Sequence, residues 1–270
     1  MSKNVLGFLG AGQMARALAE GFVRAGLIDA ANVVAHDPDA SAAEQFTRLL
    51  SDARCLDSNG QVVQDAEVVF LAVKPSQVGR VAEQLGGRLA EDRLLVSIVA
   101  GIGLDSLTRR FGTDRVIRVM PNTPCLIGQG ASGYALGSGA TADDRLLVDR
   151  LMNSVGIAVA VDEPLLDAVT GLSGSGPAFV YTVIEALADG GVRMGLARNV
   201  AVALAAQTVR GAAEMVITED VHPAVLRDRV ASPGGTTIAG IEAIEHHGLR
   251  AALMAAVRAA ADRSRELAAQ

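Results

Sequence analysis

The chain has 270 residues, half of them hydrophobic and none of them Trp, so we expect an aliphatic core in one large or two smaller domains. The formal net charge of -6 comes without any basic block, which argues against a nucleic-acid partner. Cys55 and Cys125 form neither a disulfide framework nor a metal pair, and the histidines lack metal-ligand spacing. The apolar run after Met1 meets glycines too early for a signal peptide, so we predict a cytoplasmic protein without a metal.

Strand and helix patterns alternate through the first half of the chain. Continuous aliphatic runs are typical of strands buried on both faces of a parallel sheet, and they occupy 5–10, 32–36, 66–73, 94–101 and 114–120. Helical segments are expected between them, near 13–25, 41–50, 76–85 and 104–111. A Gly-rich stretch, a helix near 142–154 and a last strand near 157–161 follow. The alternation predicts an α/β domain of Rossmann type, with a mostly parallel, doubly wound sheet, over residues 1–162.

No strand pattern continues after Glu163, so residues 163–270 are predicted to form an all-helical domain. Helices are expected near 164–170, 176–190, 197–217, 222–230, 236–247 and 249–268. Two of them, 176–190 and 197–217, are apolar nearly all round. Arg210 and Glu214 make the second a buried helix of a soluble protein and no membrane span. Such helices need more burial than a small domain offers, so we expect a second chain to cover them.

A glycine-rich turn joins the first predicted strand to the first helix. Residues 10–15 read GAGQMA and fit G-x-G-x-x-A in the context that a dinucleotide site requires. Gly10 permits the tight turn, Gly12 lets a pyrophosphate approach the backbone, and Ala15 keeps the helix close to the sheet. An ordinary strand–turn–helix corner is the alternative.

Asp37 stands at the end of the second predicted strand, where a carboxylate accepts from the adenosine ribose and repels a 2′-phosphate. No Arg lies immediately beside it in the sequence. These features favour NADH, although Asp37 could simply begin the Asp-Pro turn. The sequence does not decide between NADPH and NADH as cofactor.

Seven motifs are spread over nearly the whole chain, namely GFLGAGQMA (7–15), AVKP (72–75), RVMPNTP (118–124), LSGSGPAFVY (172–181), EALADGG (185–191), SPGGTTIAG (232–240) and RSREL (263–267). Together they resemble the pyrroline-5-carboxylate reductase family. The resemblance implies an oxidoreductase that reduces the cyclic imine 1-pyrroline-5-carboxylate to L-proline with hydride from NAD(P)H, the last step of proline biosynthesis. It also implies an interlocked homodimer, and larger rings of dimers are possible.

The predicted cofactor site gathers residues from the strand ends and the glycine-rich turn. Lys74 and Pro75 follow a strand where open α/β sheets bind ligands, and the resemblance places them beside the nicotinamide. It also assigns Asn59 to the adenosine ribose or its phosphate, although Asn59 could equally cap a helix. The full predicted set is Gly10, Gly12, Gln13, Met14, His36, Asp37, Asn59, Ala72, Val73, Lys74, Pro75 and Asn122.

The stretch ASPGGTTIAG interrupts the helical second half and predicts the substrate site. Glycines let a ligand approach the backbone, and the free N–H groups of the following helix can hold a carboxylate. The predicted substrate-binding residues are Ser232, Gly234, Gly235, Thr236 and Thr237. Thr237 matches the family threonine whose hydroxyl reaches the ring nitrogen, and we expect it to orient the imine while water protonates it. A helix N-cap at Thr236 or Ser232 is the structural alternative.

Two other functions fit the same motifs less well. One is a reductase of another small cyclic imine carboxylate, and the other is a non-catalytic dinucleotide sensor. A sensor has no need of Thr237 or the SPGG turn. The sequence leaves open the oligomer beyond a dimer, regulation by proline, and the proton donor to the imine.

Overall fold

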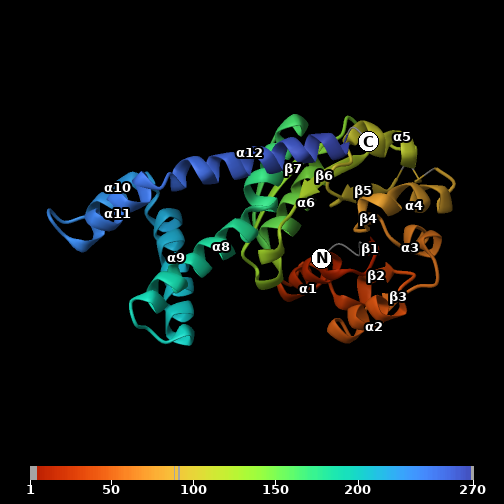
Figure 1. Cartoon of the computed structure of the whole chain (residues 1–270). Helices are drawn as coiled ribbons and strands as arrows, with labels where there is room; N and C mark the ends of the chain where they lie inside the picture. The colour runs from red at the N-terminus through yellow and green to blue at the C-terminus, as the bar shows by residue number, and fades with distance from the viewer. Residues whose placement is uncertain (1–4, 88, 91, 269–270) are drawn as a thin grey trace. The chain divides into compact units, whose positions relative to one another are not determined.

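The computed structural model describes residues 5–87, 89–90 and 92–268, and these form two compact units (Figure 1). The second unit is Gly176–Arg258, and the rest of the described chain belongs to the first, including the end of the last helix. There the Ser264 hydroxyl donates to Asp167 Oδ1 at 2.6 Å. The predicted division after residue 162 remains a proposal.

The first unit is built on one eight-stranded sheet in the order β3-β2-β1-β4-β5-β6-β7-β8. Its strands are β1 (Leu6–Leu9), β2 (Val33–His36), β3 (Arg54–Cys55), β4 (Val68–Leu71), β5 (Leu94–Ser97), β6 (Val116–Met120), β7 (Gly130–Leu136) and β8 (Gly156–Ala160). All neighbours pair in parallel except β6 and β7. This arrangement confirms the predicted Rossmann-type sheet, since a 3-2-1-4-5-6 order is its signature.

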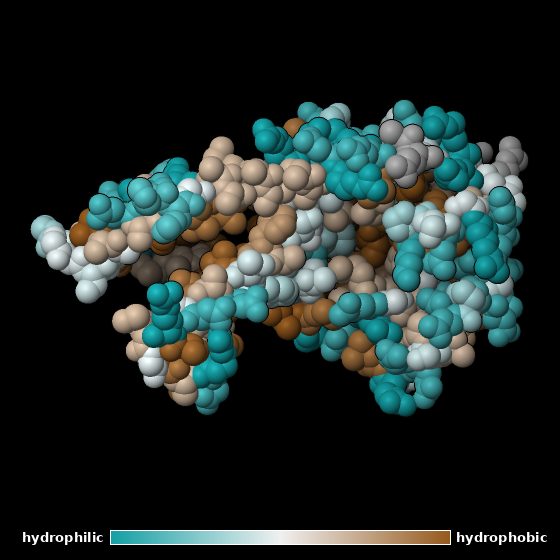
Figure 2. Space-filling model, viewed as in Figure 1, coloured by the Kyte–Doolittle hydropathy of each residue, from teal (hydrophilic) through white to brown (hydrophobic). Residues whose placement is uncertain are grey.

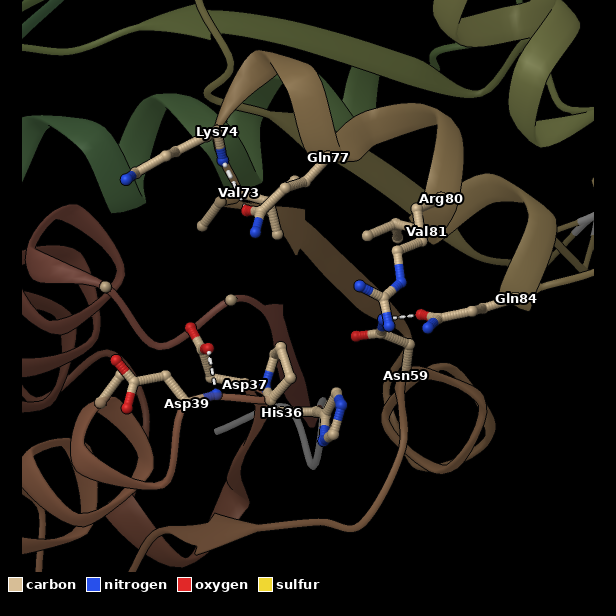
Figure 3. A pocket seen from close by; sticks show the side chains of 15 residues that line it. His36, Asp37, Asp39, Asn59, Val73, Lys74, Gln77, Arg80, Val81 and Gln84 are labelled. Atoms are coloured by element: carbon tan, nitrogen blue, oxygen red, sulfur yellow. Dashed lines mark hydrogen bonds between the residues drawn. The ribbon is translucent and has the colours of Figure 1, made fainter.

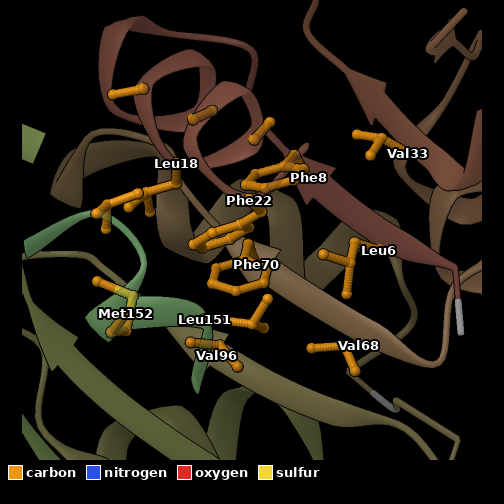
Figure 4. Close-up of a cluster of buried hydrophobic side chains, with 14 of the residues drawn as sticks. Leu6, Phe8, Leu18, Phe22, Val33, Val68, Phe70, Val96, Leu151 and Met152 are labelled. Carbon is orange, nitrogen blue, oxygen red and sulfur yellow. The ribbon is translucent and has the colours of Figure 1, made fainter. Parts of the chain in front are cut away.

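Helices cover both faces of this sheet. They are α1 (Gln13–Arg24), α2 (Ala40–Leu49), α3 (Asn59–Asp65), α4 (Val78–Gln84), α5 (Leu104–Phe111), α6 (Ala142–Asn153) and α7 (Leu166–Val169). Short helical turns also occur: η1 (Ala30–Asn32), η2 (Pro75–Gln77), η3 (Thr123–Ile127), η4 (Glu163–Leu165) and the π-helical turn η5 (Thr170–Gly174). Successive strand residues enter opposite cores, as Val68 and Phe70 join one and Val69 and Leu71 the other. Figure 4 shows the first of these cores.

Three elements of the sheet region were not predicted from the sequence, namely β3, α3 and β7. β3 has two residues, too few for a periodic pattern. β7 was predicted only as a Gly-rich stretch, because glycine is uncommon in strands. Two of its glycines are required by close packing against neighbouring residues. A Cβ at Gly130 would lie 2.2 Å from Cys125 Sγ, and one at Gly133 would lie 2.8 Å from Val169. Here close approach of neighbouring elements overrides the low strand propensity of glycine.

The second unit is helical throughout, as predicted. It contains α8 (Gly176–Arg193), α9 (Arg198–Glu219), α10 (Pro223–Arg229), α11 (Thr236–His246) and the first part of α12 (Leu249–Ala268). Its own core is small, with Ala188, Ala201 and Ala205 as the buried members. Apolar side chains therefore remain at the surface, which appears brown among these helices in Figure 2. On α8 and α9 they are Val180, Tyr181, Leu187, Val200, Val202, Leu204, Met215, Val216 and Ile217.

The helix predicted to be buried, α9, is not buried by the chain itself. By length and composition it is the one helix of the described residues that could cross a bilayer, and 11% of its most apolar 18-residue window is buried. This is weak evidence for a span, because a helix enclosed in an oligomer has the same composition. The expectation of a covering partner is considered with the function below.

Candidate functional site

The turn after β1 has the geometry that its glycines predicted. Gly10 has φ +100°, and a Cβ there would lie 2.7 Å from the carbonyl oxygen of Ala72. Gly12 is the N-cap of α1, and a Cβ there would meet no atom within 4 Å. Ala15 is fully buried against the sheet. The backbone of the turn is thus fixed from below and open above Gly12, where a phosphate can reach the N–H groups that begin α1.

A cavity of about 300 Å³ opens beside this turn, at the carboxyl ends of β2, β1 and β4 (Figure 3). Strand order reverses between β1 and β4, and ligands of open α/β sheets bind at that point. Eight of the predicted cofactor residues line the cavity: Gly10, Gly12, His36, Asp37, Asn59, Ala72, Val73 and Lys74. Residues that the sequence did not indicate line it too: Pro38, Asp39, Ala42, Gln77, Arg80, Val81 and Gln84.

The carboxylate of Asp37 binds the backbone on both sides of the cavity floor. Its Oδ2 accepts from the N–H of Ala11 at 2.9 Å, and its Oδ1 accepts from the N–H of Asp39 at 3.0 Å. Asp37 therefore braces the glycine-rich turn against the end of β2. Each oxygen keeps a further lone pair for a ribose hydroxyl, but these two donors partly compensate the negative charge.

His36 and Asn59 are held in defined orientations beside Asp37. His36 Nδ1 lies 2.8 Å from the carbonyl oxygen of Leu56, so Nδ1 carries a proton and donates it to this oxygen. The Asn59 amide donates to Gln84 Oε1 at 2.7 Å, and Asn59 is buried. The N-cap of α3 is Ser58, whose hydroxyl accepts from the N–H of Gln61, and not Asn59. Asn59 is thus free of the capping role and turned toward the cavity (Figure 3).

Two cationic side chains enter the cavity from the segment after β4. Lys74 precedes η2, and Arg80 lies in the first turn of α4. In Figure 3 the two side chains point in different directions, and Arg80 extends toward the part of the cavity that Asn59 lines. No sequence motif indicates Arg80, because it lies 43 positions after Asp37 and joins the site only through the order of the strands.

Four predicted cofactor residues do not line the cavity, namely Gln13, Met14, Pro75 and Asn122. The first two lie in the first turn of α1, and Pro75 begins η2. Asn122 is buried, its amide donates to the carbonyl of Ser173 at 3.0 Å, and its Oδ1 accepts from the N–H of Ala131 at 2.9 Å. This side chain therefore ties β7 and the turn η5 to the end of β6. Cys125 is buried and free.

The predicted substrate turn lies in the second unit. Gly234 has φ +66°, Gly235 is the N-cap of α11, and its N–H donates to the carbonyl of Ser232 at 3.0 Å. No side chain caps α11, so the alternative of an N-cap at Thr236 or Ser232 is not realised. Helix α10 ends at Arg229, close to the predicted end near residue 230 and before the glycine pair. Thr236 and Thr237 begin α11 and are exposed, and within the described residues nothing accepts from their N–H groups.

One partly buried ion pair away from the cavity stabilises the fold. Arg115 binds Asp144 through two hydrogen bonds of 2.9 and 2.7 Å, and Asp144 also completes a capping box with Thr141. Burial alone would raise the pKa of Asp144, but hydrogen bonds from Arg115 and Thr141 outweigh it and hold the pKa below its usual value. This pair fastens the start of α6 to the start of β6.

The fold and the cavity define a class, the Rossmann-type dinucleotide-binding proteins that carry a helical C-terminal region. Two family models match the chain: pyrroline-5-carboxylate reductase dimerisation over residues 163–267, and NADP oxidoreductase, coenzyme F420-dependent, over residues 5–101. The pyrroline-5-carboxylate reductase of Pisum sativum is 48% identical over 262 residues, which cover 97% of this chain and 95% of the pea protein. Pyrroline-5-carboxylate reductase 2 of Homo sapiens is 41% identical, covering 97% and 83%.

Solved structures agree with these relatives. A Plasmodium falciparum pyrroline carboxylate reductase with NADP bound has a TM-score of 0.89 and 33% identity, with 99% of both chains covered. The Coxiella burnetii enzyme has a TM-score of 0.91 and 31% identity, covering 98% of this chain and 99% of the other. The chain belongs to the pyrroline-5-carboxylate reductase family, which confirms the resemblance drawn from its motifs.

Proposed function

We propose that this protein reduces 1-pyrroline-5-carboxylate to L-proline with NADPH or NADH, the last step of proline biosynthesis. The observation that carries the proposal is similarity to pyrroline-5-carboxylate reductases over 97% of the chain, which includes both the nucleotide cavity and the SPGGTT turn. Family membership confirms the predicted enzyme class, an NAD(P)H-dependent oxidoreductase acting on a C=N bond.

The first unit holds the cofactor, which supplies a hydride to the imine carbon when bound. Free N–H groups at the start of α1 bind the pyrophosphate above Gly12, since no side chain blocks that approach. The end of β2 and the start of α3 receive the adenosine ribose through His36, Asp37 and Asn59. Gln13 and Met14 contribute from the first turn of α1. The nicotinamide side is formed by Ala72, Val73, Lys74, Pro75 and Asn122. Asn122 acts there indirectly, because its hydrogen bond to Ser173 orders the chain after β6.

The SPGGTT turn holds the substrate carboxylate. Its support is the exposed N-terminus of α11, where the N–H groups of Thr236 and Thr237 carry the positive end of the helix dipole. Gly234 and Gly235 keep side-chain atoms away from that end, and Ser232 precedes them as a further hydroxyl. The Thr237 hydroxyl orients the ring nitrogen, which takes its proton from water. Most of the rate then comes from holding the two reactants in line.

The active assembly is a homodimer whose helical regions interlock. The match to the dimerisation model supports self-association, and the exposed apolar residues of α8 and α9 supply the surface. Burying such area is worth roughly 25 cal/mol per Å². In this assembly the substrate site combines the cofactor unit of one protomer with the SPGGTT turn of its partner. The same proposal includes three further points. The dimers can assemble into a ring, the protein is cytoplasmic, and it has no nucleic-acid or membrane partner.

One assay separates this function from its two alternatives. Purified protein is mixed with NADPH or NADH and with pyrroline-5-carboxylate, and cofactor oxidation is followed at its near-ultraviolet absorbance. Rapid oxidation that needs the imine and yields proline supports the proposal. A higher kcat/KM with a six-membered or decarboxylated imine would favour a different imine reductase. Tight nucleotide binding without oxidation of any imine would favour a sensor.

A further inference from the structure

Among the residues lining the nucleotide cavity, Arg80 has no place in the activity derived above. We propose that Arg80 binds the 2′-phosphate of NADPH and so sets the choice between NADPH and NADH. This inference rests on the proposed function, because it concerns the same nucleotide site. It concerns a residue that sequence motifs did not indicate and that lies outside the glycine-rich turn.

Arg80 is placed where a 2′-phosphate would lie. The adenosine ribose of a Rossmann-bound dinucleotide sits at the end of β2, which here is His36 and Asp37. Arg80 reaches the same cavity from α4, and in Figure 3 its side chain extends toward the part of the cavity that Asn59 lines. A guanidinium offers a planar set of donors that matches the oxygens of a phosphate.

The guanidinium of Arg80 is available to a ligand. It is exposed, and within the described residues no carboxylate forms an ion pair with it. Other arginines of the first unit, such as Arg115 and Arg118, bind acidic side chains. An exposed cation in a cavity that keeps no internal partner is suited to an anionic group from outside.

The other polar groups near the ribose are weaker partners for a phosphate than Arg80. His36 donates through Nδ1 to the Leu56 carbonyl, so only Nε2 of its ring remains for a ligand, against the several donors of a guanidinium. The Asn59 amide nitrogen uses one of its two N–H groups on Gln84, and the other can bind a ligand only as an uncharged donor. Lys74 points away from Arg80 in Figure 3. Arg80 is therefore the donor that distinguishes a phosphate from a hydroxyl at this place.

The net charge of the cavity lining depends on Arg80, and this charge affects the binding of a 2′-phosphate. The charged lining residues are Asp37, Asp39, Lys74 and Arg80, whose formal charges sum to zero. Loss of Arg80 leaves a net charge of -1 around a group that carries about -1.5 to -2 at pH 7. The preference for NADH that Asp37 suggests thus remains a prediction, and Arg80 argues against it.

Binding of two adenine nucleotides that differ only in the 2′-phosphate tests this role. Calorimetry compares 2′,5′-ADP with 5′-AMP on the full-length wild type, Arg80→Gln, Arg80→Lys and the control Arg109→Gln, which changes an exposed arginine of α5 outside the cavity. We expect Arg80→Gln to weaken 2′,5′-ADP binding about 10- to 100-fold and leave 5′-AMP unchanged, as for a lost charged hydrogen bond. Arg80→Lys should restore part of the affinity, and the control should match wild type.

Steady-state kinetics gives a second readout. Arg80→Gln should raise KM for NADPH with kcat nearly constant, and the constants for NADH should not change. Equal losses for 2′,5′-ADP and 5′-AMP, or no loss for either, would overturn the role of Arg80 while leaving the reductase function standing. Failure of the wild type to bind any of these nucleotides would overturn both.

Discussion

Gly10 and Gly12 lie two positions apart in the same turn, yet the structure predicts opposite consequences for their substitution. Gly12 has φ -67° and ψ -177°, which any residue adopts, and a Cβ there meets no atom within 4 Å. Gly12→Val should therefore change the free energy of unfolding by less than about 1 kcal/mol. The added methyl groups instead occupy the space through which a pyrophosphate reaches the start of α1.

The cost to cofactor binding follows from the contacts that this space permits. Backbone N–H groups that bind phosphate oxygens form charge-assisted hydrogen bonds worth about 1.5–3 kcal/mol each. Loss of two such bonds weakens NADPH binding by about 3 kcal/mol or more, which is roughly 100-fold. Calorimetric titration of NADPH into Gly12→Val measures this loss, and thermal unfolding of the same protein measures its stability.

Gly10→Ala provides the matched comparison. Its φ of +100° lies in a region that side chains disfavour, and its Cβ would come within 2.7 Å of the Ala72 carbonyl oxygen. We expect a loss of about 2 kcal/mol or more in unfolding free energy, seen as a lower melting temperature. Wild-type affinity of Gly12→Val for NADPH, or a melting temperature of Gly12→Val as low as that of Gly10→Ala, would contradict these assignments.

Three further predictions concern the rest of the molecule. Thr237→Ala should lower kcat/KM for the imine by roughly 10- to 100-fold while the cofactor dissociation constant stays constant, and unchanged turnover would exclude an orienting role. Asp144→Asn should destabilise the protein by about 2 kcal/mol at pH 7, because it breaks the pair with Arg115. Since the folded pKa of Asp144 is lowered, its stabilisation is present above about pH 4 and disappears as pH falls through the folded pKa, so in chemical denaturation the variant should match wild type only in strong acid. The wild type should sediment as a dimer or larger at low micromolar concentration, and Leu204→Glu should sediment as a smaller species. The control Leu146→Glu, at an exposed position of α6, should keep the wild-type size. A fully active wild-type monomer would exclude the interlocked dimer.

The sequence by itself determined the class of the fold and the position of its nucleotide turn. Long aliphatic runs and the GAGQMA motif are local patterns, and they can be interpreted without knowing which elements pack beside them. For the same reason the helices of the second unit were predicted well. The apolar surfaces of α8 and α9 also follow from composition, because too few charged residues were present to cover them.

Tertiary structure decided what depends on the neighbours of an element. The glycines of β7 look like a loop until Cys125 and Val169 are seen to occupy the space where side chains would lie. Asp37 appeared free to meet a ribose, but the N–H groups of Ala11 and Asp39 bind its oxygens. Arg80 entered the nucleotide cavity because β1 lies between β2 and β4, so that residues distant in the chain meet at one edge of the sheet. Proximity of this kind is set by strand order, which no local pattern encodes.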